Sequence, residues 1–314
     1  MRNISGWASK CSMKLDKNAP KCGVLVWKCS KRERGDRQLL EESHSVPRVS
    51  IILPTYNRAK LVCRAIDSVW EQSFSDFELI VVDDGSTDDS REILESLYGG
   101  RARFRYCYQQ HHNVSSARNL GIAMARGELL AFIDSDDAWL PTKLAQQVSA
   151  MDDADLLMVH TGRLLMEELG CRRASLPFYC DPLARDRSDL LGGIGKVAMS
   201  VLVRKSAVES VGKFDEELQT TQDLDLWLRI ARIGKIALIE QPLMKSYKQV
   251  DGIMSRDLGQ KVRDRLEVFK RVLAEPHPLI VEHNWRAAIA RHEDFLANHL
   301  NEQQSTVHLH QDKS

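Results

Sequence analysis

The chain of 314 residues has no net charge and no long apolar run. Lysine plus arginine and aspartate plus glutamate are balanced at 44 each, so the chain as a whole has no electrostatic reason to bind nucleic acid. No apolar run approaches the roughly 18 to 20 residues of a membrane-spanning helix, and the start lacks the apolar core of a signal peptide. We therefore expect a cytoplasmic protein without a nucleic-acid partner. Peripheral contact with the cytoplasmic face of a membrane stays open.

Cysteine is scarce, and the common phosphate-binding loops are missing. The seven cysteines are an odd number and widely scattered, in a chain too long to need a disulfide framework, so reduced thiols are expected. The sequence contains neither GxGxxG nor GxxxxGKS/T. Their absence weakens the interpretations as a dinucleotide oxidoreductase and as a P-loop protein.

Charge and periodicity divide the chain into three segments. The first 48 residues carry 11 Lys or Arg against 5 Asp or Glu without sustained periodicity, so residues 1–46 are expected to form a poorly ordered basic arm. Residues 47–256 alternate apolar strands with amphipathic helices, the signature of an α/β fold with a mostly parallel sheet flanked by helices. Residues 257–314 have the pattern of a C-terminal helical extension. It would cover the core, dock on a membrane or pack against a second copy in a homo-oligomer.

Acidic residues follow the most apolar of these runs. Leu129 to Ile133 is typical of a buried strand, and Asp134, Ser135 and Asp136 come directly after it. Because side chains alternate along a strand, Asp134 and Asp136 are expected to leave the sheet on one side and Ser135 on the other. Two carboxylates suit a hard divalent cation such as Mg²⁺ or Mn²⁺. The alternative is an acidic turn that only caps the next helix.

Two earlier apolar runs also end in polar residues. The first ends at Pro54, shortly before Tyr56 and Asn57, and the second ends in Asp83 and Asp84. In doubly wound sheets, ligands bind outside the carboxyl ends of the strands, so these residues are candidates for a binding site. Each also has a structural alternative, namely a helix cap for the acids and a core position for Tyr56.

Five motifs in this order make residues 49–255 similar to the inverting family-2 glycosyltransferases of the GT-A fold. They are SIILPTYNR at 50–58, LIVVDDGSTDDS at 79–90, SSARNLGI at 115–122, FIDSDDAWLPTKL at 132–144 and GKFDEELQTTQDLDLWLRI at 212–230. The resemblance implies a nucleotide-sugar donor, which we expect to be UDP-linked, and a hydroxyl acceptor on a glycan or lipid. It also implies a place in cell-surface polysaccharide or lipopolysaccharide synthesis.

The resemblance further implies roles for individual residues. It assigns nucleotide-sugar binding to Pro54, Tyr56, Asn57, Asp84, Arg118, Asp134 and Ser135. Asp136 would contact the divalent metal directly, Asp134 would be the other carboxylate of the DxD motif and lie closer to the ribose, and Asp223 would be the catalytic base. A single displacement needs no carboxylate nucleophile, which predicts inversion at the anomeric carbon.

One departure from the family pattern leaves alternatives open. Members often carry a histidine a few residues after a Tyr-Arg pair, whereas this chain has Tyr247 and Lys248 followed by Val250 at the expected histidine position. Either Lys248 supplies a cation near the diphosphate, or the metal affinity is low. A non-catalytic nucleotide- or glycan-binding protein of the same fold is the main alternative. A sugar nucleotidyltransferase is a second, although LPTYNR stands where its glycine-rich loop is expected.

Overall fold

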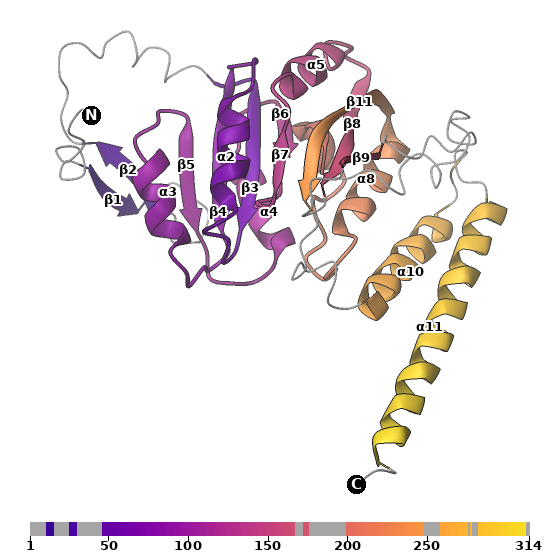
Figure 1. Ribbon diagram of the computed structural model, residues 1–314. Helices are drawn as coiled ribbons and strands as arrows, with labels where there is room; N and C mark the ends of the chain where they lie inside the picture. The colour runs from indigo at the N-terminus through magenta and orange to yellow at the C-terminus, as the bar shows by residue number, and fades with distance from the viewer. Residues whose placement is uncertain are drawn as a thin grey trace.

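The computed structural model describes residues 46–166, 199–247, 258–275, 277 and 282–311, with short strands at 11–15, 25–29 and 172–175. These residues form one large sheet covered by helices on both faces, with two helices at the C-terminal end of the chain (Figure 1).

The first half of the large sheet is parallel. Its strands lie in the order β5 (Phe104–Tyr108), β4 (Phe77–Asp83), β3 (Val49–Thr55) and β6 (Leu129–Phe132). Their crossovers contain α2 (Val62–Trp70), α3 (Ser90–Tyr98) and α4 (Val114–Met124). All residues of β3, β4 and β6 are buried, as expected for strands covered on both faces. The polar residues that follow these strands therefore meet at one edge.

The second half of the sheet mixes parallel and antiparallel pairs. Beyond β6 the order continues with β10 (Val201–Arg204), β8 (Leu156–Met166), β11 (Lys235–Tyr247) and β7 (Asp137–Trp139), and β9 (Arg172–Ser175) pairs with β8. Among the described strands here, only β8 and β11 run parallel, while β10, β7 and β9 pair antiparallel with their neighbours. The expected mostly parallel sheet is thus parallel in its first half and mixed in its second.

Alternating side chains divide the core into two layers. Ile51 and Leu53 of β3 face the layer built with α2, α3 and α5 (Lys143–Ala150). Ile52 between them faces the opposite layer, which is built with α4, α7 (Lys205–Ser210), α8 (Gln222–Ile233) and α10 (Leu258–Ala274). This period of two is the reason that helices cover both faces of the sheet.

The two C-terminal helices pack against each other. Phe269 of α10 meets Trp285 of α11 (Glu282–Gln311) edge-to-face, with ring centroids 5.2 Å apart, and Trp285 is fully buried. The far end of α11 extends beyond the body of the molecule (Figure 1).

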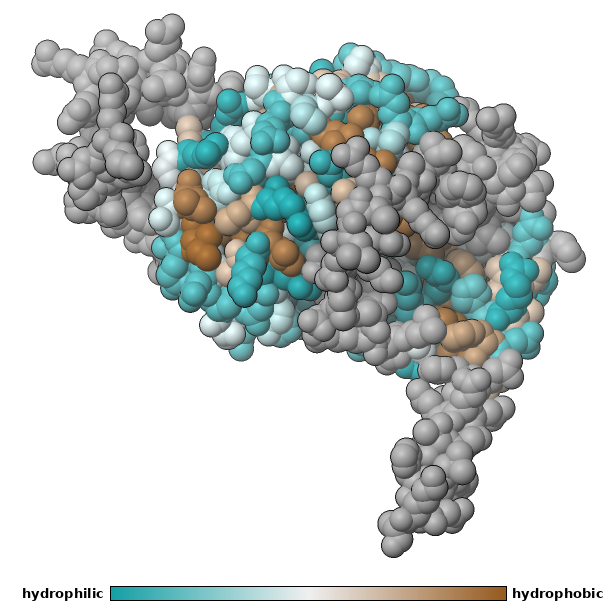
Figure 2. Space-filling view, viewed as in Figure 1, coloured by the Kyte–Doolittle hydropathy of each residue, from teal (hydrophilic) through white to brown (hydrophobic). Residues whose placement is uncertain are grey.

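No helix within the described part of the chain is both long and apolar enough to cross a bilayer. The face shown in Figure 2 is largely hydrophilic, with its hydrophobic residues in small separate groups.

The expected N-terminal arm contains two strands. β1 (Cys11–Leu15) and β2 (Leu25–Cys29) pair antiparallel, with Cys11 opposite Cys29. The remainder of residues 1–45 lies outside the described residues, so the expectation of a poorly ordered arm stays a prediction. Of the other cysteines, Cys63 and Cys107 are described; Cys63 is half-buried and Cys107 is buried.

A lysine is buried completely at the start of α5. The ammonium of Lys143 lies 4.1 Å from the centroid of the Trp139 ring and donates to Gln147 Oε1 at 2.6 Å. Gln147 in turn donates to the carbonyls of Val159 and Ser200, which ties α5 to β8 and to the segment that enters β10. Burial lowers the pKa of Lys143 to about 7.

We expect Lys143 to make stability depend on pH. Between about pH 7 and the unfolded-state pKa near 10.4, the unfolded chain binds a proton that the folded chain has lost. The free energy of unfolding should therefore rise with pH across this window, by up to about 1.4 kcal/mol per pH unit. Urea unfolding at a series of pH values measures this slope. Lys143→Met should abolish it, and an unchanged slope in that variant would contradict the assignment.

Candidate functional site

The DxD residues lie in a turn and not on a strand. β6 ends at Phe132, and the amide of Asp137 donates to the carbonyl of Asp134 at 3.0 Å, which closes a turn before β7. The expectation that strand alternation orients Asp134 and Asp136 is therefore wrong. Ser135 is buried in this turn, whereas Asp134 and Asp136 remain partly accessible. Within this turn the two carboxylates interact, since the charge of Asp134 raises the pKa of Asp136.

Arg118 connects helix α4 to this turn. It is only 4% exposed, and its Nη2 donates to Asp134 Oδ1 at 2.7 Å. The Nε and Nη1 atoms of Arg118 are buried and have no hydrogen-bond partner among the described residues. Buried donors without partners are costly, so these two atoms favour the binding of an acceptor such as a phosphate oxygen. Arg118 thus lies beside the DxD turn, as a nucleotide contact would require.

Carboxylate repulsion at the turn is what a cation would relieve. Burial raises the pKa of Asp136, and the charge of Asp134 raises it further, while Arg58 and Arg64 oppose this shift. Burial is also the largest cause that raises the pKa of Asp137 well above its usual value. The charges of Asp134 and Asp136 are the next largest causes, and they raise it as well. The described residues contain no group of three or more metal-binding side chains. Two carboxylates are a donor set that suits a divalent ion whose other ligands are phosphate and water oxygens.

Asp84 is the centre of a polar cluster after β4. It is 4% exposed, and its carboxylate accepts from Gln109 Nε2 at 2.5 Å and from the amide of His112 at 3.1 Å. His111 Nδ1 lies 2.9 Å from Asp84 Oδ2, and its ring stacks on Tyr56 with centroids 4.0 Å apart. Tyr56 is 41% exposed, so it is not the core aromatic of the structural alternative. The stacked pair offers a flat surface next to a buried carboxylate.

Asn57 holds the loop that follows Asp84. Its Oδ1 accepts from the amides of Thr87 at 2.8 Å and Asp88 at 3.3 Å, and its own amide donates to Ser86 Oγ at 2.9 Å. Its φ of 50° is left-handed, a conformation that asparagine tolerates better than most residues. Pro54 is buried within β3. Asn57 therefore holds the loop at 86–88 against the end of β3, the strand that contains Pro54.

Asp223 enters the site from the first turn of α8. Burial raises its pKa, the charge of Arg118 lowers it, and the charge of Asp134 raises it. The charges of the Arg118–Asp134 ion pair thus act on the carboxylate of Asp223 in opposite directions. Thr221, immediately before the helix, has a φ of 57°, which is rare for a β-branched residue. Strained backbone of this kind is typical of functional sites.

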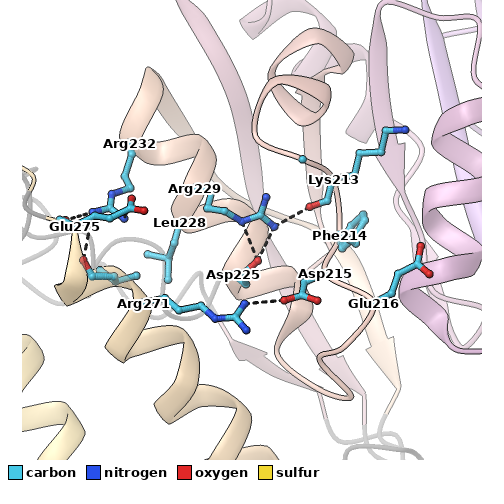
Figure 3. A pocket seen from close by; sticks show the side chains of 12 residues that line it. Lys213, Phe214, Asp215, Glu216, Asp225, Leu228, Arg229, Arg232, Arg271 and Glu275 are labelled. Carbon is cyan, nitrogen blue, oxygen red and sulfur yellow. Dashed lines mark hydrogen bonds and ion pairs between the residues drawn. The ribbon is translucent and has the colours of Figure 1, made fainter.

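A separate cavity of about 510 Å³ lies between α8, α10 and the loop at 212–216 (Figure 3). Six of its charged side chains form pairs: Arg229 with Asp225, Arg271 with Asp215, and Arg232 with Glu275. Since helix residues advance by about 100° each, Asp223 points roughly opposite to Asp225. The cavity is thus not part of the site around Asp223. Its ion pairs join α10 to the loop at 212–216 and α8 to the residue after α10.

Sequence reasoning missed several cations and acids at the site. Arg64 Nη2 donates to the carbonyl of Asp136 at 2.6 Å, and its guanidinium lies 3.6 Å from the centroid of the Tyr247 ring. Arg58, His111 and Asp137 are further members. Arg58 and Asp137 belong to motifs read from the sequence, so their position in those motifs was an available signal. Arg64 and His111 carry none.

One part of the expected site lies outside the described residues. Lys248 and Val250, on which the question of the missing histidine depends, are not described. Between residues 162 and 198 the structure describes the end of β8, which continues to Met166, and β9 at Arg172–Ser175.

Residues 50–212, more than half of the chain, match Glycosyl transferase family 2, and the chain belongs to this family. TuaG of Bacillus subtilis, named for teichuronic acid biosynthesis, is 28% identical over 228 residues, which are 72% of this chain and 88% of TuaG. The chain spans 32% of the Rickettsia felis glycosyltransferase that it matches and 64% of the one from Rickettsia prowazekii.

Solved structures confirm the GT-A fold. S. aureus TarS 1–349 in complex with UDP-GlcNAc gives a TM-score of 0.59 at 20% identity, covering 82% of this chain and 73% of that one. The mannosyltransferase PcManGT from Pyrobaculum calidifontis, in complex with GDP-Man and Mn²⁺, gives 0.60 at 20% identity, covering 81% and 71%. The mixed second half of the sheet and the C-terminal helices accordingly belong to this fold class.

We expect Asn57→Ala to destabilise the protein by about 1–3 kcal/mol, because it removes the acceptor of two loop amides and leaves alanine in a left-handed conformation. Asn57→Asp keeps both the acceptor and the tolerance for positive φ, so it serves as the matched control. Asn57→Gly, which relaxes the backbone but lacks the acceptor, should lie between them. Urea unfolding of the three variants provides the measurement. Equal stability of the alanine and aspartate variants would refute this role.

Proposed function

We propose that the chain is a metal-dependent, inverting glycosyltransferase that moves a sugar from a UDP-linked donor to a hydroxyl of a glycan or lipid-linked acceptor. The observation that supports this most is the ion pair between Arg118 and Asp134 of the DxD turn, whose two charges both act on the carboxylate of Asp223. A base next to the donor's phosphates is the arrangement that a single displacement needs. Membership of the family supports glycosyl transfer, and the inversion, the metal and the donor are parts of the proposal.

The proposed reaction is one displacement at the anomeric carbon. The acceptor oxygen attacks this carbon from the face opposite the diphosphate, and its new bond forms as the bond to the diphosphate oxygen breaks. The acceptor proton passes to Asp223, and the nucleoside diphosphate leaves. A positioned general base contributes about 10²- to 10⁴-fold to such a step. Because no glycosyl-enzyme forms, the configuration inverts.

The nucleotide would lie across the carboxyl ends of β3, β4 and β6. The base would stack on the exposed Tyr56 and hydrogen-bond to the buried Asp84, and the buried donors of Arg118 would meet phosphate oxygens. Asp136 would hold Mg²⁺ or Mn²⁺, with Asp134 engaged by Arg118 and closer to the ribose. A bound divalent ion supplies charge compensation for the leaving diphosphate.

Relatives support the class of product. TuaG is named for teichuronic acid biosynthesis, which favours a role in cell-surface polysaccharide assembly for this chain as well. UDP-GlcNAc in TarS favours a UDP-linked donor, while GDP-Man in PcManGT keeps the choice of nucleotide an experimental question.

Calorimetric titration with UDP, GDP and CDP, each with and without Mn²⁺, tests the donor site. We expect UDP to bind most tightly, and only in the presence of Mn²⁺. Asp136→Ala should reduce this metal-dependent affinity at least about tenfold, since it removes a charged ligand whose interaction exceeds a neutral hydrogen bond. Glu217→Gln, an exposed change in the loop before α8, is the control. Absence of binding to all three nucleotides would rule out the donor site.

Asp223→Asn separates binding from catalysis. We expect it to bind UDP and Mn²⁺ like the wild type, and to release UDP from a UDP-sugar about 10²- to 10⁴-fold more slowly. The measurement is donor hydrolysis with Mn²⁺ present. A variant that hydrolyses the donor at the wild-type rate would show that Asp223 is not the base.

The raised pKa of Asp223 predicts the acidic side of the pH profile. A base acts when deprotonated, so kcat/KM should fall as pH drops through a pKa that burial holds above the ordinary value of about 3.9. Donor hydrolysis measured against pH, with folding checked by circular dichroism at each point, gives this limb. If this limb gives a pKa at or below the ordinary aspartate value, it would contradict the assignment of the half-buried Asp223 as the base.

A further inference from the structure

Helix α10 is attached directly to the loop that precedes α8, the helix that carries Asp223. The carboxylate of Asp264 accepts from the amide of Thr220 at 2.7 Å and from its hydroxyl at 2.8 Å, and Gln260 Nε2 donates to the same carboxylate at 2.6 Å. Both Thr220 and Asp264 are buried. Because Thr220 is three residues before Asp223, the first turns of α10 lie next to the proposed base.

Two cations on these turns lie on either side of Asp264 in the sequence and within range of the charge of Asp223. Lys261 and Arg265 are four residues apart and so lie on one side of α10. The charge of Asp223 acts on both of them, and it is the only acidic residue with a resolved effect on either. Neither forms a salt bridge with a described residue, and the buried Nε of Arg265 has no hydrogen-bond partner within the described part of the chain.

The cations repel one another at this position. Burial is the largest cause that lowers the pKa of Lys261, and the charges of Arg265 and of Arg163 on β8 lower it further. Burial likewise lowers the pKa of Arg265. Lys261 and Arg265 are partly buried, and Asp223 is the one acidic side chain with a resolved effect on either of them among the described residues. This cluster of two cations is therefore suited to a negatively charged ligand.

The position of the cluster favours the acceptor over the donor. Asp134 and Asp136, which mark the donor's phosphates, have Arg58, Arg64 and Arg118 as their neighbouring cations. Helix α10 is instead tied through Asp264 to Thr220, three residues before Asp223, and a general base must contact the hydroxyl of the acceptor. A group beside the base on α10 therefore meets the acceptor.

We propose that Lys261 and Arg265 form a subsite for an anionic group of the acceptor, a carboxylate or a phosphate close to the hydroxyl that is glycosylated. This inference rests on the proposed function and names its acceptor class as an acidic glycan or a phosphate-bearing chain. The subsite holds the acceptor so that its hydroxyl reaches Asp223, and the negative charge of the ligand offsets the mutual repulsion of the cations.

Binding of three related sugars to the full chain, saturated with UDP and Mn²⁺, tests the subsite. Glucose, glucuronate and glucose 6-phosphate share one ring and differ in having a hydroxymethyl, a carboxylate or a phosphate group. We expect at least one anionic sugar to bind about tenfold or more tightly than glucose, as charged hydrogen bonds would provide. The relative affinities of the two anions then distinguish a uronic acid from a phosphate. Equal affinity for all three sugars, or no detectable binding of the anions, overturns the proposal.

Variants of α10 show whether the preference arises from this subsite. Lys261→Met and Arg265→Met should each reduce the preference for the anionic sugar several-fold, and together abolish it, while the affinity for UDP stays within about twofold. Arg265→Lys keeps the charge and should retain most of the preference even if the methionine variants are unstable. Arg263→Gln, on an exposed position of the same helix, is the matched control.

The same measurements separate the two proposals. If the methionine variants weaken UDP binding and leave sugar binding unchanged, the cations serve the diphosphate and the acceptor subsite is wrong. If the wild type binds no nucleotide but still prefers the anionic sugars through Lys261 and Arg265, the anion subsite stands and the proposed function fails.

Discussion

The organisation of the site depends on the ion pair between Arg118 and Asp134. Three carboxylates, those of Asp134, Asp136 and Asp137, lie within the four-residue stretch 134–137 after β6. Without a buried cation, their repulsion would favour protonation of the carboxylates or displacement of the turn. Arg118 comes from α4, which packs on β3 and β4, so the pair also joins the turn to the parallel half of the sheet. Its charge extends to Asp223, where it opposes the effect of burial.

The two halves of the sheet have different tasks. The parallel half holds Asp84 and the DxD turn at adjacent strand ends, because β3 pairs with both β4 and β6. The mixed half and the helices after it bring Asp223 on α8 and the basic side of α10 towards the same edge. A donor can thus lie on rigid, fully buried strands while the acceptor meets helices joined by polar contacts such as that between Thr220 and Asp264.

Local signals predicted the parallel half well. Apolar runs ending in Pro54, Asp84 and Asp134 indicated buried strands and their carboxyl ends, and the family resemblance and the GT-A fold are confirmed. The reason given for the DxD pair was wrong, since a turn and not strand alternation brings the carboxylates together. The strand β7 was missed because it has three residues and exists only through its pairing with β11, about a hundred positions later.

The sequence by itself determined the fold class, the order of the motifs and the identity of the acids, because these depend on short-range patterns of apolar and polar residues. The tertiary structure alone decided which cations accompany those acids. Arg64, His111, Lys261 and Arg265 have no distinguishing local pattern, and they reach the site through long-range packing of α2, the loop after β5 and α10. Charge interactions act across space and not along the chain, so only the folded arrangement shows which carboxylate each cation meets.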